Sequence, residues 1–221
     1  MGKRSDNLPR RLARLPTAVI ADVMDEIGLL RQTLPAPIRP LIPDMRVAGY
    51  AFTARGRPFR GAARERDATL RRSLAMLSAV PADSVLVLAT NDTGAAHFGE
   101  LGAEWLRARR VRGAVIDGGT RDAAFLIRAR FPAFVRYRSP LQPTGRWRVA
   151  DWGQPLTIGG VRVSLGDVVV GDLDGVVVVP RRVATEVLAR GEKLVAAHNA
   201  VRRALKRGMT LLAAYEKFGG F

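Results

Sequence analysis

The chain has 221 residues, a formal net charge of +16 and no cysteine, which excludes disulfides, thiolate nucleophiles and cysteine-ligated zinc or iron–sulfur sites. Its hydrophobic content of 48% suits a single domain over residues 1–221 better than two independent cores. No run of about eighteen uncharged apolar residues is present, and no apolar stretch follows the basic start, so we expect a cytoplasmic protein with no membrane partner.

The spacing of apolar residues predicts helices over 15–30, 65–80, 98–111 and 122–131, and strands over 46–58, 83–90, 112–119 and 131–140. Thr17 is a candidate cap for the first helix, and Gly28 lies near its end. Four prolines between residues 31 and 45 indicate an extended connector. This alternation is typical of mixed α and β layers packed in one domain.

The pattern changes at residue 147. Short β segments continue to residue 180, separated by Gly-Gly, Gly-Asp and Asp-Gly turns. Asp172 and Asp174 resemble a pair of metal ligands, but Asp-Gly between strands is a turn signal, and we interpret both as turn residues. Residues 181–221 are predicted to be helical, with a break at Gly208.

The positive charge is almost all arginine, because only Lys3, Lys193, Lys206 and Lys217 are lysines. A basic excess of this size makes anionic small molecules or nucleic acid plausible partners. The arginines are spread through the whole chain, however. A general bias toward arginine in the proteins of the source organism explains them as well as a binding patch does. The densest cluster, residues 55–73, lacks the interleaved aromatic residues of a single-strand stacking platform and is expected to be a loop and a solvated helix face.

Several catalytic classes are missing their residues. No lysine occurs between residues 4 and 192, which makes an imine-forming aldolase very unfavourable. His97 and His198 are the only histidines, too few for a histidine metal cage. There is no nucleophile elbow, no P-loop and no dinucleotide-binding motif, and we therefore also discount a methyltransferase. What remains is carboxylate, arginine and backbone amide chemistry.

Those groups gather at two predicted helix starts. Arg121 and Asp122 lie between a strand and a helix, where a guanidinium fork suits a carboxylate and an aspartate suits Mg²⁺. Gly99 and Glu100 open the preceding helix, where the amides of Leu101 and Gly102 are available to an anion. Together these are the parts of a site for a 2-oxo acid.

Structural roles compete with this interpretation. Asp122 is equally suited to cap the helix that follows it, and Glu100 to interact with the dipole of its own helix. Asp117 and Thr120 are interpreted as residues of a Gly-Gly turn that ends the strand before Arg121.

Glu100, twenty intervening residues and then Arg121-Asp122, within "GELG" and "GAVIDGGTRD", resemble the Asp/Glu-x20-Arg-Asp signature of the RraA-like family. That family holds class II 4-hydroxy-4-methyl-2-oxoglutarate aldolases, oxaloacetate decarboxylases and the regulator of ribonuclease activity A. The resemblance covers nearly the whole chain, in the blocks "LPTAVIADVMDEIGL", "IRPLIPDMRVAGYAFTA", "FPAFVRYRSP", "IGGVRVSLGDVVVGDLDGVVVVP" and "GMTLLAAYEKFG".

The resemblance implies an α/β fold, a β/β/α sandwich of the swivelling phosphohistidine-domain type. It also implies a homotrimer or hexamer in which residues 181–221 pack on a neighbouring subunit. By the same similarity Arg121, with the Gly99, Leu101 and Gly102 backbone, would hold the carboxylate of the substrate. Asp122 would bind Mg²⁺ or Mn²⁺, and Glu100 would move protons near the waters of the metal.

The implied reaction is cleavage of a carbon–carbon bond to leave a metal-stabilised enolate, which is protonated to pyruvate. A retro-aldol and the loss of CO₂ from oxaloacetate share this enolate. The alternative in the same family is a non-catalytic regulator that binds a ribonuclease or an RNA-processing complex.

Two parts of the implied site stay open. The family's aldolases take a further acidic residue from a neighbouring subunit, and here either Glu192 or His198 is the candidate. The pocket for the departing half of the substrate is expected to come from residues 55–66 or the neighbouring tail, where Arg57, Arg60 and Arg64 are candidates to select a second carboxylate.

Overall fold

The computed structural model describes residues 7–61 and 65–218. Its strands are β1 (Arg39–Pro40), β2 (Val47–Pro58), β3 (Ser84–Ala89), β4 (Ala96–Phe98), β5 (Gly113–Thr120), β6 (Ala133–Arg138), β7 (Trp147–Trp152), β8 (Leu156–Ile158), β9 (Val161–Val163), β10 (Val168–Asp172) and β11 (Gly175–Val179). Its helices are α1 (Leu8–Leu12), α2 (Thr17–Glu26), α3 (Arg66–Ala79), α4 (Glu100–Ala108), α5 (Ala123–Arg128), α6 (Ala184–Lys206) and α7 (Leu211–Phe218), with a 3-10 turn at Arg181–Val183.

The main sheet has the strand order β1-β6-β5-β3-β2-β10-β11, with β4 paired to β5 and β7 to β2. The pairs β2–β3, β3–β5, β4–β5 and β5–β6 are parallel, while β1, β7, β10 and β11 run antiparallel to their neighbours. Strands β8 and β9 form a separate two-stranded ribbon. The mixed α/β class is therefore confirmed, whereas the swivelling phosphohistidine-domain type stays a prediction.

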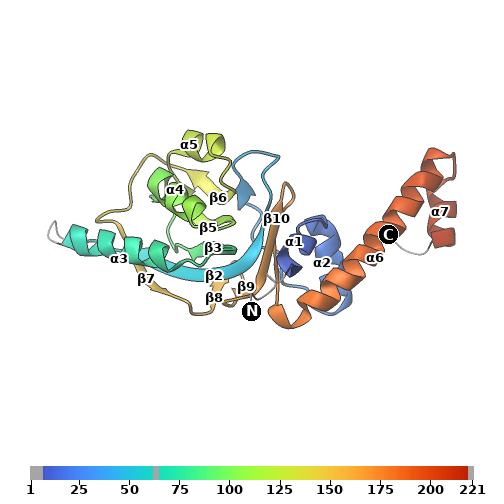
Figure 1. Cartoon of the computed structure of the whole chain (residues 1–221), viewed down its shortest axis with the longest axis horizontal. Helices are drawn as coiled ribbons and strands as arrows, with labels where there is room; N and C mark the ends of the chain where they lie inside the picture. The colour runs from blue at the N-terminus through green and yellow to red at the C-terminus, as the bar shows by residue number, and fades with distance from the viewer. Residues whose placement is uncertain (1–6, 62–64, 219–221) are drawn as a thin grey trace, which may run out of the picture.

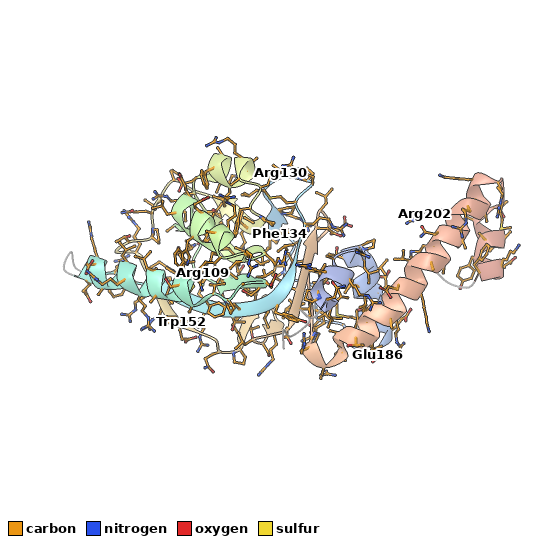
Figure 2. All side chains as sticks on the ribbon, in the orientation of Figure 1. Arg109, Arg130, Phe134, Trp152, Glu186 and Arg202 are labelled. Carbon is orange, nitrogen blue, oxygen red and sulfur yellow. The ribbon has the colours of Figure 1, made fainter. Side chains whose placement is uncertain are left out.

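The central strands are buried on both faces. In β3, Leu86 and Leu88 pack in a cluster with residues of α3, α4 and α5, and Val85 and Val87 pack in a second cluster with the β8–β9 ribbon. This is why β3 is a continuous apolar run and not an alternating one. Figure 2 shows Phe134 of β6, which belongs to the second cluster, in the middle of the body. The carboxyl ends of β3 and β5 are thereby held in a rigid frame.

A third cluster lies at the β10–β11 edge, where α1, α2 and the first turns of α6 cover the sheet. Helix α2 begins at Thr17, as expected, but Thr17 is not its side-chain cap. The carboxylate of Asp172, at the end of β10, accepts the Thr17 backbone N–H at 2.9 Å and its hydroxyl at 2.6 Å. Asp172 also accepts the N–H of Asp174 at 3.1 Å, so the interpretation of both as structural residues is supported.

The C-terminal helices form an arm. Figure 1 shows α6 passing over α2 and then continuing away from the body, with α7 folded back beside its far end. The break at Gly208 is confirmed, since its φ of +89° lies in the region that favours glycine. No helix in the described part of the chain is long and apolar enough to span a membrane.

The strand predicted over residues 46–58 is confirmed as β2, so the start of the arginine cluster at 55–73 is strand and not loop. Strand β2 runs on to Pro58 and pairs with β7, with a register shift between Arg55 and Gly56. A Cβ on Gly56 would lie 2.0 Å from the Trp147 ring, so glycine is needed there for close packing and not to end the strand.

Candidate active site

The strand that leads to the candidate site does not stop at its two glycines. Strand β5 continues through Gly118 and Gly119 to Thr120, so the prediction of a turn, with Asp117 and Thr120 as turn residues, is wrong. A Cβ on Gly119 would lie 2.3 Å from the Tyr137 ring, and one on Gly118 would lie 2.6 Å from Thr90. Glycine is required at both positions because neighbouring side chains cross the strand, a cause that local sequence does not reveal.

Arg121 and Asp122 follow strand β5 and lie beside the start of α4. The Arg121 N–H donates to the carbonyl of Phe98 at 2.9 Å, which joins the end of β5 to the end of β4. Asp122 has a φ of +56°, a left-handed conformation that non-glycine residues seldom adopt and that often accompanies a functional site.

The left-handed backbone explains which helix Asp122 caps. It occupies the N-cap position of α5 but makes no side-chain hydrogen bond to that helix. Its Oδ2 instead accepts the backbone N–H of Glu100 at 3.1 Å and the Nε–H of Arg121 at 3.2 Å. The predicted cap on the following helix is therefore wrong, because the Asp122 carboxylate binds the start of α4 instead, and this contact unites Glu100, Arg121 and Asp122.

Gly99 leaves room for the Asp122 carboxylate, and Gly102 is closely packed in α4. A Cβ on Gly99 would lie 2.6 Å from Oδ2 of Asp122, and one on Gly102 would lie 3.1 Å from the Phe98 ring. The first amides of a helix have no intrahelical acceptor. With the Glu100 amide bound to Asp122, the amides of Leu101 and Gly102 are the ones available to an anion.

A cavity of about 280 Å³ opens over these residues. Its walls come from α3, from the β4–α4 junction, from Arg121 and Asp122, and from the segment before β7; its lining is Thr69, Leu70, Ser73, Leu74, Leu77, Ala96, His97, Phe98, Gly99, Glu100, Leu101, Gly102, Arg121, Asp122, Gln142, Pro143, Thr144 and Trp147. The residues predicted to hold the substrate carboxylate and the metal all line it, namely Gly99, Glu100, Leu101, Gly102, Arg121 and Asp122. Arg121 is the one arginine or lysine among the described lining residues.

Two of the three arginines expected to face the departing half of the substrate do not line this cavity. Arg57 and Arg60 are absent from the described lining, and Arg64 lies outside the described residues. Helix α3 supplies one wall of the cavity, with Leu70 and Leu74 about half exposed, at 48% and 52%. An amphipathic helix gives no sign in its sequence of which exposed leucines line a cavity.

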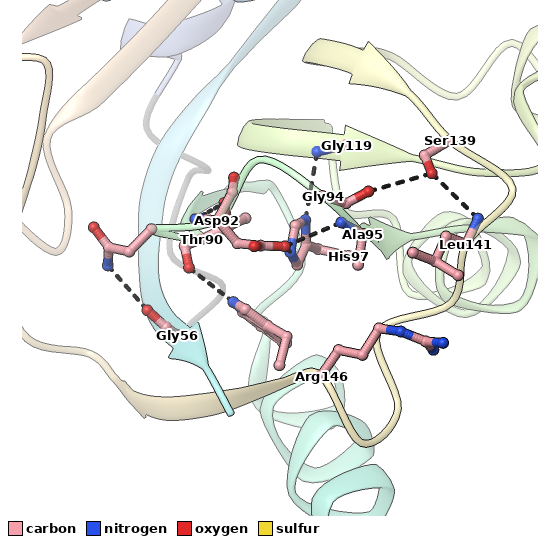
Figure 3. Close-up of polar contacts among 12 residues, drawn as sticks. Gly56, Thr90, Asp92, Gly94, Ala95, His97, Gly119, Ser139, Leu141 and Arg146 are labelled. Carbon is pink, nitrogen blue, oxygen red and sulfur yellow. Dashed lines mark hydrogen bonds and ion pairs between the residues drawn. The ribbon is translucent and has the colours of Figure 1, made fainter. Parts of the chain in front are cut away.

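Nothing in the sequence indicated a histidine–aspartate pair at the wall of the cavity. The side chain of His97 on β4 is fully buried, and its Nε2 lies 3.0 Å from Oδ2 of Asp92. Its Nδ1 accepts the N–H of Gly119 at 3.4 Å, so the neutral ring carries its proton on Nε2 and donates it to Asp92. Figure 3 shows the ring between the Asp92 loop and strand β5.

Burial lowers the pKa of the His97 imidazole, against the opposing effects of the Asp92 carboxylate and the Gly119 amide. Nearby, burial raises the pKa of Tyr137 to about 12, and its hydroxyl donates to the carbonyl of Ala95 at 2.9 Å. Both rings are therefore neutral at physiological pH, and their hydrogen bonds hold the β4–β5 junction in place.

The two candidates on α6 lie elsewhere in this chain. The Glu192 carboxylate accepts hydrogen bonds from the Arg11 guanidinium at 2.7 to 3.1 Å within the same chain. Nε2 of His198 is buried without a hydrogen-bond partner among the described residues. Neither residue lines the cavity in a single chain.

The comparison with protein families agrees with this geometry. The family described as RraA-like, Aldolase/RraA, matches residues 17–178. The chain belongs to the RraA-like family. A protein of Halalkalibacterium halodurans named "Putative 4-hydroxy-4-methyl-2-oxoglutarate aldolase" is 29% identical over 201 residues, which cover 91% of this chain and 90% of the relative.

Two solved structures have a similar fold. RraAS2 of Streptomyces coelicolor, described as an unusual member of the RNase ES inhibitor RraA protein family, is 26% identical with a TM-score of 0.78, covering 91% of this chain and 98% of its own. An uncharacterized protein of Pseudomonas syringae is 27% identical with a TM-score of 0.82, covering 97% of this chain and 99% of its own.

Proposed function

We propose that this RraA-like protein is a divalent-metal-dependent carbon–carbon lyase that acts on a 2-oxo acid in the cytoplasm. Its reactions would be retro-aldol cleavage of substrates like 4-hydroxy-4-methyl-2-oxoglutarate, decarboxylation of oxaloacetate, or both, with pyruvate as the product. The observation that carries the proposal is the contact of Asp122 with both Arg121 and the start of α4 at the edge of the cavity. The name of the H. halodurans relative supports the aldolase half.

Substrate binding falls to Arg121 and the start of α4. The Arg121 side chain is 40% exposed and has donors beyond the Nε that meets Asp122, so its fork can hold the substrate carboxylate. The Leu101 and Gly102 amides, at the positive end of the helix, add donors for the same carboxylate. This fixes the reacting carbon atoms in the cavity.

The residues present fit a Mg²⁺ or Mn²⁺ ion held mainly through waters. The described residues contain no group of three or more acidic or histidine side chains that could enclose a metal, but Mg²⁺ is often bound through one or two carboxylates. Asp122 is one third exposed, and the hydrogen bonds to its carboxylate from described residues all fall on Oδ2, which leaves Oδ1 for a ligand. When bound there, the ion supplies the positive charge that stabilises an enolate after carbon–carbon cleavage.

We assign proton transfer to Glu100. It belongs to the cavity lining, and its backbone is fixed by Asp122. Glu100 can accept the proton of a substrate hydroxyl as the carbon–carbon bond breaks, and a proton returned to the methylene carbon then gives pyruvate.

The proposal is tested by pyruvate release from oxaloacetate and from 4-hydroxy-4-methyl-2-oxoglutarate, with Mg²⁺, with Mn²⁺ and with EDTA. We expect turnover that needs the metal and is lost in Asp122→Ala. A folded protein that turns over neither substrate with either metal would overturn the proposal.

The second half of the proposal concerns assembly, as a homotrimer or hexamer in which residues 181–221 pack on a neighbouring subunit. The arm supports this, because its outer half carries large exposed apolar side chains, namely Leu205, Leu211, Leu212 and Tyr215. A second subunit would also bring Glu192 or His198 near the cavity of the first. Light scattering on the purified protein tests it, and a monomer at micromolar concentration would contradict it.

A non-catalytic regulator of a ribonuclease or RNA-processing complex is the alternative. The likeness to RraAS2 and the net charge of +16 favour it. RNA binding that falls steeply between low and moderate salt, together with no lyase turnover, would support this role over the enzyme.

A further inference from the structure

A second cavity, of about 450 Å³, lies at the opposite end of the sheet from Arg121. It is formed where α3, α4 and α5 return to the amino ends of β3, β5 and β6, with α1 beside them. Arg121, in contrast, follows the carboxyl end of β5. The two cavities share no lining residue, so the second one has no part in the site described above. We call it the arginine cavity.

Its lining is much richer in arginine than the rest of the chain. Arginine is about one residue in seven overall but five of the ten residues that line this cavity, namely Arg10, Arg107, Arg110, Arg112 and Arg130. One acidic residue, Asp83, lines it as well. A general abundance of arginine does not account for this concentration.

Much of this positive charge lacks a close partner. Arg112 pairs with Asp83, and Arg107 pairs with Glu104 at 2.7 Å. The contact of Arg130 with Asp44 is long, at 3.9 Å, between side chains that are 84% and 64% exposed. For Arg10 and Arg110, no described acidic side chain lies within ion-pair distance, which leaves guanidinium groups for a ligand.

Two of the arginines occupy backbone positions where glycine is the usual residue. Arg110 and Arg130 follow the ends of α4 and α5 with φ values of +60° and +49°. A left-handed conformation costs an L residue about 1 kcal/mol relative to glycine. Arg110 and Arg130 therefore place side chains on this rim at two positions where the backbone conformation favours glycine.

We propose that the arginine cavity binds a small anion that carries two or more linked phosphate groups. Guanidinium forks match phosphate oxygens in pairs, and five arginines with one aspartate favour a ligand of several negative charges over a monocarboxylate. The volume exceeds that of a single phosphate and suits a di- or triphosphate group. The inference is independent of the lyase proposal.

The test is isothermal titration of the full-length protein with inorganic triphosphate, ATP and citrate in low salt. We expect triphosphate to bind at least about tenfold more tightly than citrate. Equal affinity for triphosphate and ATP would indicate recognition of the phosphates alone, and tighter binding of ATP would add a contact to the nucleoside. Both results support the proposal.

The decisive variant is Arg110→Gly with Arg130→Gly, which removes two side chains and relieves their backbone conformations, so folding is not at risk. We expect it to lose about tenfold or more in triphosphate affinity. The matched control is Arg202→Ala with Arg203→Ala, an equal loss of charge on the arm, where Figure 2 places Arg202 far from Arg130.

Three results would overturn the proposal. One is no detectable binding of triphosphate at millimolar concentration. Another is an equal loss of affinity in the Arg202 and Arg203 control, which would mean that diffuse charge attracts the anion. The third is tight binding of single-stranded RNA without terminal phosphates, at concentrations where triphosphate does not bind.

Discussion

The carboxylate of Asp122 accepts the backbone N–H of Glu100 across 22 positions of sequence, at 3.1 Å. One side chain thereby fixes the start of α4 and also lies beside Arg121. Capping and catalysis are not competing explanations for Asp122, since the same carboxylate has one oxygen in the cap and one left for a ligand.

These two roles can be separated by replacement. Asp122→Asn keeps an acceptor for the Glu100 N–H and tolerates the left-handed backbone, but it removes the charge that a metal needs. We expect turnover to fall by about 100-fold or more, while the free energy of unfolding stays within about 0.5 kcal/mol of wild type. Asp122→Ala should lose the activity and also about 1 kcal/mol of stability. Urea unfolding measures the change in stability, and pyruvate release measures the change in activity. An active Asp122→Asn enzyme would show that Asp122 serves only to cap α4.

The Gly99 position tests whether the carboxylate must stay where it is. Gly99→Ala places a Cβ 2.6 Å from Oδ2 of Asp122, so the carboxylate has to move. We expect kcat/KM to fall by about 100-fold, since small displacements at a reacting centre have effects of this size. Gly94→Ala is the control, because the nearest atom to its Cβ is 3.9 Å away. Similar activity in both variants would show that the position of Asp122 is not critical.

His97 should make stability depend on pH. Because burial lowers its pKa in the folded protein, the unfolded chain binds a proton between that lower value and about 6.5 while the folded chain does not. Stability therefore falls as pH drops below about 6.5, by at most about 1.4 kcal/mol per pH unit. Urea unfolding at pH 7.5 and 5.5 should show this loss in wild type and a smaller one in His97→Gln. His198 is present in both proteins, and parallel losses would assign the effect to other groups.

The leucine wall of α3 offers control over the distal half of the substrate. Leu74→Arg adds a cation to a cavity whose described lining has Arg121 alone. We expect it to raise kcat/KM for 4-hydroxy-4-methyl-2-oxoglutarate by about tenfold, relative to 4-hydroxy-2-oxopentanoate, which has no second carboxylate. Leu212→Arg makes the same charge change on α7. An unchanged substrate ratio in Leu74→Arg would place the departing half elsewhere.

The order of the longer strands and helices and the grouping of Glu100, Arg121 and Asp122 could be predicted from the sequence, because apolar periodicity and helix starts are local signals. The short elements α1, β1 and β4 were not predicted. The path of β5 through Gly118 could not, because the side chains that exclude a Cβ there come from Thr90 and His97. The cap of α2 is equally nonlocal, with Asp172 lying 155 positions from Thr17. Contacts of this kind decide details that periodicity leaves undetermined.

Burial of the central strands on both faces has a consequence for motion. We expect the amide hydrogens of β3 and β5 to exchange with solvent more slowly than those of the arm, which is held on one side only. Arg121 directly follows β5 and its N–H is bound to the Phe98 carbonyl, so we expect its backbone to be among the slowly exchanging parts. A substrate carboxylate would then meet a guanidinium whose backbone is already ordered, and little entropy would be lost in ordering it on binding.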